Sequence, residues 1–373
     1  MMQLQSPNPP QALFAVLLAL LSTSCTRDAP MTADAAIDIA LLGQALIEHD
    51  PRLHVEAPLA SVLPFLDGQD IVMSNLEVAV CAANAQCEPT RTDQYFHGTD
   101  PSVLDYLDAI GVNLLSLANN HAWDYGATGV LSTIEEARRR GIVHAGTGPT
   151  LADATAPAYM DVAGQRVALV AIASAKLQPE AAATARRPGV NILLPDDTEA
   201  WQRNIDAIQR ASAEAELTVV YQHFQSLGTP EWQQSWARAA IDSGADLYVS
   251  HGAPELSGVE HYGGGLILYG LGNFIFHSRS EVGHYPPEVW ESVLVLLSFE
   301  AGQIGTVTFV PITIDEGTPG PDFLQERGYP ALASGEDAAR ILKRLEALSA
   351  PFGTRIRIDG DRAYLDLAAR ASR

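Results

Sequence analysis

The sequence has few basic residues. Its 373 residues include 23 Lys and Arg against 45 Asp and Glu, which gives a formal net charge of −22 and a pI near 4.7. Proteins that bind nucleic acid neutralise its phosphates with clustered Lys and Arg, and no stretch of this chain resembles such a basic stripe. The composition therefore argues against a nucleic-acid partner, and acidity of this size mainly favours solubility.

Cysteine is also scarce, with three residues in the chain. Cys81 and Cys87 lie close together in "CAANAQC", a spacing that is not that of a zinc-knuckle pair, and no second pair is present. In an exported protein we expect these two cysteines to form a small disulfide on a loop, because disulfides persist in oxidising compartments. In a cytosolic protein they would instead be two free buried thiols.

The apolar stretch "ALFAVLLALLSTSC", residues 12–25, is too short to span a bilayer as a helix but has the length of a signal-peptide core. Its small residues before Cys25 are similar to a bacterial lipoprotein signal, although no Lys or Arg precedes it and Ser22 stands where Leu is usual. We therefore predict a signal peptide over residues 1–25 and an exported protein. That protein is either anchored to the membrane through a lipid at Cys25 or released as a periplasmic or extracellular protein.

Short runs rich in Val, Ile and Leu alternate with stretches of helical spacing. The runs predict buried strands at 37–42, 71–74, 113–117, 167–173, 217–221, 247–250 and 266–269. The helical stretches cover 101–110, 129–140, 197–213 and 231–243. This alternation predicts an α/β fold, a layered sandwich of mixed β-sheets flanked by helices.

The pattern changes beyond residue 290. "SVLVLLSFEAGQIGTVTFVPI" predicts two strands joined at "AGQ", and "GTRIRIDGDRAYLDL" predicts another pair that turns at "DGD". One predicted helix, 337–348, separates the two pairs. Without an internal repeat or a long linker, residues 26–373 are predicted to form one domain with a β-rich C-terminal elaboration.

Polar side chains able to bind a metal follow four of the predicted strands. They are Glu77, Asn120 with the adjacent His121, His223 and His251. Ligands of open α/β sheets gather at the carboxyl ends of the strands, so we expect these side chains to lie together. Carboxylate, amide oxygen and imidazole groups suit Mn, Fe or Zn, which activate water or polarise a phosphoryl oxygen.

Each of these residues taken alone also has a structural explanation. A single histidine at a strand end more often makes a structural hydrogen bond, Glu77 could cap a turn, and Asn120 could satisfy loop backbone. Their joint occurrence favours the metal site. His121 need not be a ligand, so we assign it the role of a general acid that protonates a leaving oxygen. Asp124 to Gly126 are interpreted as a turn and helix start.

Four segments together resemble the CapA family, whose members are associated with poly-γ-glutamate capsule synthesis. They are "NLEVAV", "LANNHAWDYGATGVLSTIEEARRRGI", "GADLYVSHGAPELSGVEHYGGG" and "ILYGLGNFIF". The similarity covers about residues 36–315, which leaves 316–373 as the C-terminal elaboration. It implies a calcineurin-like metallophosphoesterase fold with a metal site at its strand ends. The matching motif positions are Glu77, Asn120, His121, His223 and His251.

The chain departs from the family at two motif positions. Gln44 stands where the family usually has Asp after its first strand, and Gly252 and Pro254 stand where it often has two further histidines. In related two-metal phosphoesterases these positions mainly serve one of the metals. We therefore predict that no two-metal centre forms, unless Glu255 or Asp50 compensates. The site then holds either no metal or one divalent ion bound by Glu77, Asn120, His223 and His251.

Two functions follow from this pattern. The first is a metal-dependent hydrolase of the envelope, acting on a phosphoester or on γ-glutamyl or glycan bonds. The second is a non-catalytic accessory protein that binds an anionic polymer such as poly-γ-glutamate or works with the capsule synthesis machinery. An acidic protein repels such a polymer unless a metal or a basic patch faces it. The candidates for that patch, which are more typical of solvated helix and loop charge, are Arg138, Arg139, Arg140, Arg186 and Arg187.

Overall fold

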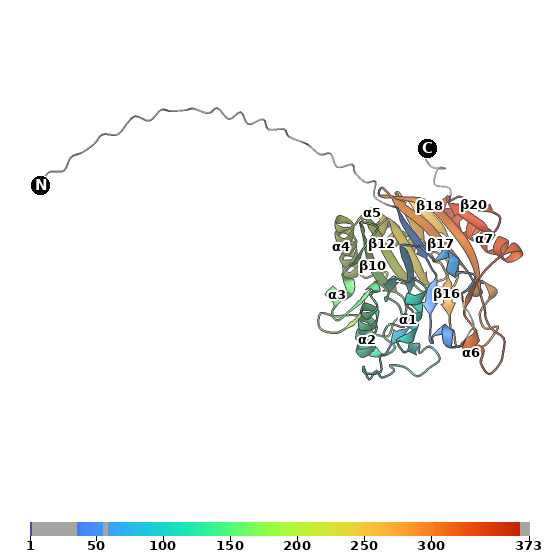
Figure 1. The fold of residues 1–373 in the computed structure, drawn as a ribbon, viewed down its shortest axis with the longest axis horizontal. Helices are drawn as coiled ribbons and strands as arrows, with labels where there is room; N and C mark the ends of the chain where they lie inside the picture. Colours follow the sequence, from blue (N-terminus) through green and yellow to red (C-terminus); the bar gives the residue numbers. More distant parts are fainter. Residues whose placement is uncertain (2–35, 55–58, 366–373) are drawn as a thin grey trace, which may run out of the picture. The chain divides into compact units, whose positions relative to one another are not determined.

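The structure, a computed structural model, describes Met1 and residues 36–54 and 59–365 (Figure 1). Residues 36–365 belong to a compact unit that spans Asp34–Arg373. The predicted signal peptide, with Cys25, lies outside the described residues. None of the helices in the described segments has the length and apolarity needed to cross a membrane.

One mixed sheet has nine strands, in the order β20-β21-β18-β17-β1-β3-β6-β7 with β19 beside β18. Its parallel part consists of β1 (Ile37–Leu41), β3 (Ile71–Asn75), β6 (Leu114–Ser116) and β7 (Val143–Ala145). Its antiparallel part consists of β17 (Glu291–Glu300), β18 (Gln303–Ile314), β19 (Pro330–Leu332), β20 (Ile356–Asp359) and β21 (Arg362–Leu365). The strands beyond residue 290 therefore extend the sheet that contains β1.

The second mixed sheet has six strands, in the order β14-β15-β13-β12-β10-β9. The central strands β10 (Gln165–Ser174), β12 (Leu217–Phe224), β13 (Leu247–Gly252) and β15 (Gly265–Leu268) are parallel. The edge strands β9 (Ala158–Val162) and β14 (Val259–Tyr262) are antiparallel to their neighbours. Shorter elements are β2 (Gln44–Leu46) with β16 (Asn273–Phe276), β4 (Ala79–Val80) with β5 (Gly98–Thr99), β8 (Thr147–Gly148) with β11 (Gly189–Val190), α3 (Leu151–Thr155) and α6 (Phe323–Glu326).

The inner faces of the two sheets form one hydrophobic core. Along β1, Ile39 and Leu41 point into the cluster shared with β10 and β12, whereas Ala40 and Leu42 point to the opposite face. Outside the first sheet lie α1 (Ser102–Ala109) and α2 (Gly126–Arg139), and outside the second lie α4 (Thr198–Glu214) and α5 (Glu231–Asp242) (Figure 1). The helix α7 (Gly335–Ser349) packs on the C-terminal strands. The predicted α/β sandwich of mixed sheets flanked by helices is confirmed.

Most predicted elements are present with bounds within a few residues. The "AGQ" turn joins β17 to β18, and the "DGD" turn joins β20 to β21. The strands β9 and β14 were not predicted, because they lie at sheet edges, where β9 is only partly buried and gives no continuous apolar run. The loop that follows β4 carries the disulfide between Cys81 and Cys87, as expected for an exported protein.

The carboxyl group of Asp246, just before β13, is mostly buried and makes stability depend on pH. Its Oδ2 accepts a hydrogen bond from the backbone N of Thr218 at 2.8 Å. Burial raises the pKa of Asp246 from its usual 3.8 to about 6, although backbone hydrogen bonds oppose the shift. Folding thus favours the protonated form. The stability gained from this protonation is present below the usual pKa of 3.8. It is lost as the pH rises through about 6, the pKa in the folded protein.

We expect Asp246→Asn to remove this dependence on pH. At about pH 8 the variant should be more stable than the unaltered protein by about 1–2 kcal/mol, because Asn keeps the acceptor oxygen without the charge. This value is set below what the full shift would give at about 1.36 kcal/mol per pKa unit. Below about pH 4 the two proteins should have equal stability. Urea unfolding of both proteins across this range checks the prediction, and a stability difference that stays constant with pH would contradict it.

Candidate functional site at the strand ends

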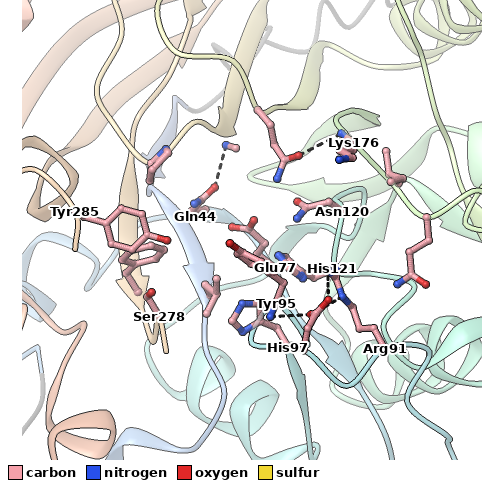
Figure 2. Close-up of a pocket in the computed structure, with 18 of the residues that line it drawn as sticks. Gln44, Glu77, Arg91, Tyr95, His97, Asn120, His121, Lys176, Ser278 and Tyr285 are labelled. Carbon is pink, nitrogen blue, oxygen red and sulfur yellow. Dashed lines mark hydrogen bonds and ion pairs between the residues drawn. The ribbon is translucent and has the colours of Figure 1, made fainter. Parts of the chain in front are cut away.

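A cleft of about 860 Å³ lies where strands of both sheets end. The ends of β3 and β6 supply Glu77, Asn120 and His121 to its lining. Figure 2 shows these three side chains turned toward the centre of the cleft, with Tyr95 and Lys176 among the residues around them. The first sheet therefore contributes a carboxylate, an amide and an imidazole to one hollow.

His223 and His251 of the second sheet lie beside one another on β12 and β13, and neither is among the residues that line the cleft. They are paired in register, and their side chains are buried, with relative exposures of 0% and 2%. The Nε2 atom of His223 lies 3.5 Å from Oε1 of Glu77, which joins the contributions of the two sheets. The structure thus places Glu77 of the first sheet next to His223 of the second, with His251 beside His223.

The buried donor and acceptor atoms of this group lack partners. Glu77 Oε2, Asn120 Oδ1 and His223 Nε2 make no hydrogen bond with any described residue, and the imidazole of His251 has only the main chain of Leu42 acting on it. One such buried group costs about 1–3 kcal/mol while it stays unpaired, so a ligand that paired with several of them would stabilise the site. A divalent cation fits carboxylate, amide oxygen and imidazole ligands. Within the described segments, however, no group of three or more His, Cys, Asp or Glu side chains has the arrangement of a metal site.

Burial favours the neutral forms of these groups. It raises the pKa of Glu77 well above its usual range, and the charge of Asp124 adds to the effect. Burial also lowers the pKa of His223 far below its usual range, with His121 and His251 acting in the same direction. The pKa of His251 falls to about 3 for the same reason, and the main chain of Leu42 opposes the shift. A bound cation would favour an ionised carboxylate and neutral imidazoles.

His121 forms a buried pair with Asp124. The Nδ1 atom of His121 lies 2.9 Å from Oδ2 of Asp124, whose side chain is fully buried. The same oxygen accepts a hydrogen bond from the backbone N of His97 at 2.8 Å, which fixes the carboxylate in place. Burial lowers the pKa of His121, and the hydrogen bond to Asp124 opposes that shift.

The interpretation of Asp124 as a simple turn residue was therefore incomplete. Its carboxylate bonds a backbone amide, as a turn residue often does, but it also orients His121. A signal was present in the sequence, because an acid three residues after a histidine can reach its ring across a turn. The remainder of the turn is as predicted, since Gly126 begins α2 with a φ of +58°.

Gln44 is part of a structural hydrogen-bond network. Its Nε2 donates to Oδ1 of Asn273 at 2.8 Å, and its Oε1 accepts from the backbone N of Gly252 at 2.9 Å. Both ends of this buried amide are therefore occupied by the protein itself. Pro254 lines the cleft but has no ligand atom in its side chain.

The neighbouring acids have other partners. Oε2 of Glu255 lies 2.9 Å from Nη2 of Arg344, and Oδ2 of Asp50 lies 2.6 Å from Nη2 of Arg52. Neither acid lines the cleft. In this structure they do not replace the ligands that the sequence lacks.

Three of the five arginines considered as a basic patch form ion pairs, and Arg186 and Arg187 form none with a described residue. Arg138 pairs with Glu135, and both Arg139 and Arg140 pair with Glu136 on the same helix. Arg187 donates to a backbone oxygen and lies over the ring of Trp123. These contacts agree with their interpretation as helix and loop charge.

These features define a layered α/β protein whose strand ends surround a cleft with carboxylate, amide and imidazole groups. The chain belongs to the family of bacterial capsule synthesis proteins called PGA_cap, whose model matches residues 32–278. The predicted CapA-family membership is thereby confirmed. All five predicted site residues lie within the matched region.

Named relatives cover most of the chain. The PGA biosynthesis protein CapA of Bacillus subtilis is 31% identical over 265 residues, which are 70% of this chain and 66% of the relative. The capsule biosynthesis protein CapA of Bacillus anthracis is 28% identical over 289 residues, 75% of this chain and 67% of the relative. A probable polyglutamine synthesis accessory protein of Mycobacterium tuberculosis is 25% identical over 300 residues, 77% of this chain and 74% of the relative.

Proposed function

We propose that this protein takes part in capsule polymer synthesis at the cell envelope as a hydrolase that depends on one divalent metal ion. In this proposal the layered sandwich is a metallophosphoesterase-like fold. The substrate is a phosphoester, or a γ-glutamyl or glycan bond of the envelope. The observation that supports it most is that buried side-chain oxygen and nitrogen atoms of Glu77, Asn120, His223 and His251 have no hydrogen-bond partner that satisfies them.

The residues would divide the work as follows. Glu77, Asn120, His223 and His251 would hold the ion, which can be Mn, Fe or Zn. When bound there, the ion supplies polarisation of a substrate oxygen and a lowered pKa of bound water. His121 would pass a proton from Nε2 to the leaving oxygen, while Asp124 holds Nδ1 and so fixes the orientation of the ring.

The names of the relatives supply the setting of the proposal. Relatives named for capsule and PGA biosynthesis suggest that this chain acts at the envelope on an anionic polymer such as poly-γ-glutamate. Its partners would be that polymer or the capsule synthesis machinery. A lipid on Cys25 would anchor it to the membrane after export.

The second candidate is a non-catalytic accessory protein that holds the polymer. It is favoured by the amide network of Gln44, which occupies the position of a family metal ligand with structural hydrogen bonds. In this case the cleft would bind the polymer without cleaving it.

Two single substitutions separate these candidates. With added Mn²⁺ and a phosphodiester substrate, His121→Ala should lower the rate about 10²- to 10⁴-fold, because it removes the proton donor. His223→Ala should abolish the activity, because it removes a metal ligand. Metal content is the control: His121→Ala should keep its metal and His223→Ala should lose it. Absence of activity from every protein, including the unaltered one, would favour the accessory role.

A further inference from the structure

The ammonium group of Lys176 is a cation at the cleft that has no ion-pair or hydrogen-bond partner among the described residues. It lies two residues beyond β10, so it belongs to the same strand-end edge as His223 and His251. The residue lines the cleft and is exposed, and its side chain makes no ion pair or hydrogen bond with a described residue. It is one of two lysines in the chain.

The other strongly basic residue of the cleft lining is already neutralised. The Nε of Arg91 lies 2.9 Å from Oδ1 of Asp93, and its guanidinium lies 5.6 Å from the centre of the Tyr95 ring. Among the described residues that line the cleft, Lys176 is therefore the basic residue whose charge no acidic side chain neutralises.

The loop that carries Lys176 is held close to the candidate catalytic pair. The backbone N of Lys176 donates to Oε1 of Gln225 at 3.2 Å. Two residues later, Nε2 of Gln178 donates to Oγ1 of Thr90 at 2.9 Å and reaches Oδ1 of Asp124 at 3.3 Å. The backbone at Lys176 is thus positioned by neighbouring segments, while its ammonium group stays available.

The charge of the molecule makes a free cation at this place consequential. A chain with a net charge of −22 repels anions at long range. A lysine ammonium is a compact charge on a flexible stem, which suits a carboxylate or a phosphate in varied orientations. A cation on the cleft wall offsets this repulsion where such a group binds.

We propose that Lys176 determines the specificity of the cleft by binding an anionic oxygen group, a carboxylate or a phosphate, of the substrate. The inference rests on the proposed function, because it names the chemical class that the same cleft accepts. Lys176 acts on substrate binding and takes no part in holding the metal.

Calorimetric titration with a synthetic γ-linked tetraglutamate tests the inference. Lys176→Met should weaken binding about 2- to 5-fold, the value of one exposed charged contact, whereas Lys176→Arg should keep most of the affinity. The matched control is Lys343→Met, which removes the same charge from the exposed outer part of α7 and should leave the affinity unchanged. Added salt should weaken binding more in the unaltered protein than in Lys176→Met.

Inorganic phosphate is the second probe and distinguishes the two anion sources. If it binds more tightly than tetraglutamate and loses affinity in Lys176→Met, the group recognised is a phosphate; the reverse order identifies a carboxylate. Equal affinity of Lys176→Met and the unaltered protein for both probes would overturn the inference, and so would the absence of binding of either probe.

Manganese binding by the same proteins separates this inference from the proposed function. Retained Mn²⁺ with weakened tetraglutamate binding in Lys176→Met supports both. Tetraglutamate binding that depends on Lys176 in a protein that binds no Mn²⁺ would overturn the metal proposal and leave the role of Lys176 standing.

Discussion

Replacing Gly252 by histidine is expected to destabilise the protein by about 3 kcal/mol or more, although it restores a residue that the family often has there. Gly252 has a φ of +112°, a backbone conformation that residues with a side chain rarely adopt. A Cβ atom at this position would lie 2.7 Å from the backbone N of Phe224 and 2.8 Å from its C and O atoms. The strain therefore adds to an overlap with the backbone of the paired strand, which cannot swing aside as a flexible side chain can.

Thermal or urea unfolding measures this loss, and a second glycine provides the control. Gly264 has a φ of +94° but has nothing within 4 Å of its added Cβ. Gly264→Ala should therefore suffer the conformational strain alone and lose about 1 kcal/mol. A Gly252→His protein of unaltered stability that binds a second metal ion would refute our interpretation of this position.

Manganese is expected to stabilise the unaltered protein, and His223→Ala is expected to eliminate the effect. At a free concentration of about 100 times its Kd, one ion that binds only the folded state adds about 2.7 kcal/mol to the free energy of unfolding. The buried atoms of the site have no partners in the described protein, so the ion would also satisfy groups that are otherwise unpaired. His223 is central because its Nε2 lies between the two sheets, 3.5 Å from Glu77.

The measurement is the melting temperature with and without Mn²⁺. His121→Ala is the matched control, since it alters a histidine of the same candidate site that is not a proposed ligand. It should keep the metal-dependent rise in melting temperature that His223→Ala loses. An equal rise in all three proteins would mean that Mn²⁺ binds elsewhere.

Much of the fold could be predicted because its strands have unusually clear sequences. In β10 the residues that face the other sheet and those that face the helices are both buried, so the strand reads as a continuous apolar run. The polar residues after such runs could then be placed at one edge of the sheets. That reasoning brought Glu77 and His223 into one group without knowledge of their distance.

Other parts of the site depend on contacts between distant segments and could not be predicted. Gln44 was recognised as a poor ligand, but its bond to Asn273, 229 residues away, is visible only in the fold. The role of Asp124 depends in the same way on the backbone of His97. Lys176 was overlooked because free charge depends on which acids lie nearby. Arg138 and Arg140, which were considered first, are paired with acids of α2 and α1.

The number of metal ions bound per chain tests the central claim most directly. Purified protein would be washed with a chelator, reloaded with Mn²⁺, freed of excess metal and analysed by elemental mass spectrometry. The site described here predicts about one tightly bound ion per chain, and none in His223→Ala. Two tightly bound ions in the unaltered protein, or none, would contradict it.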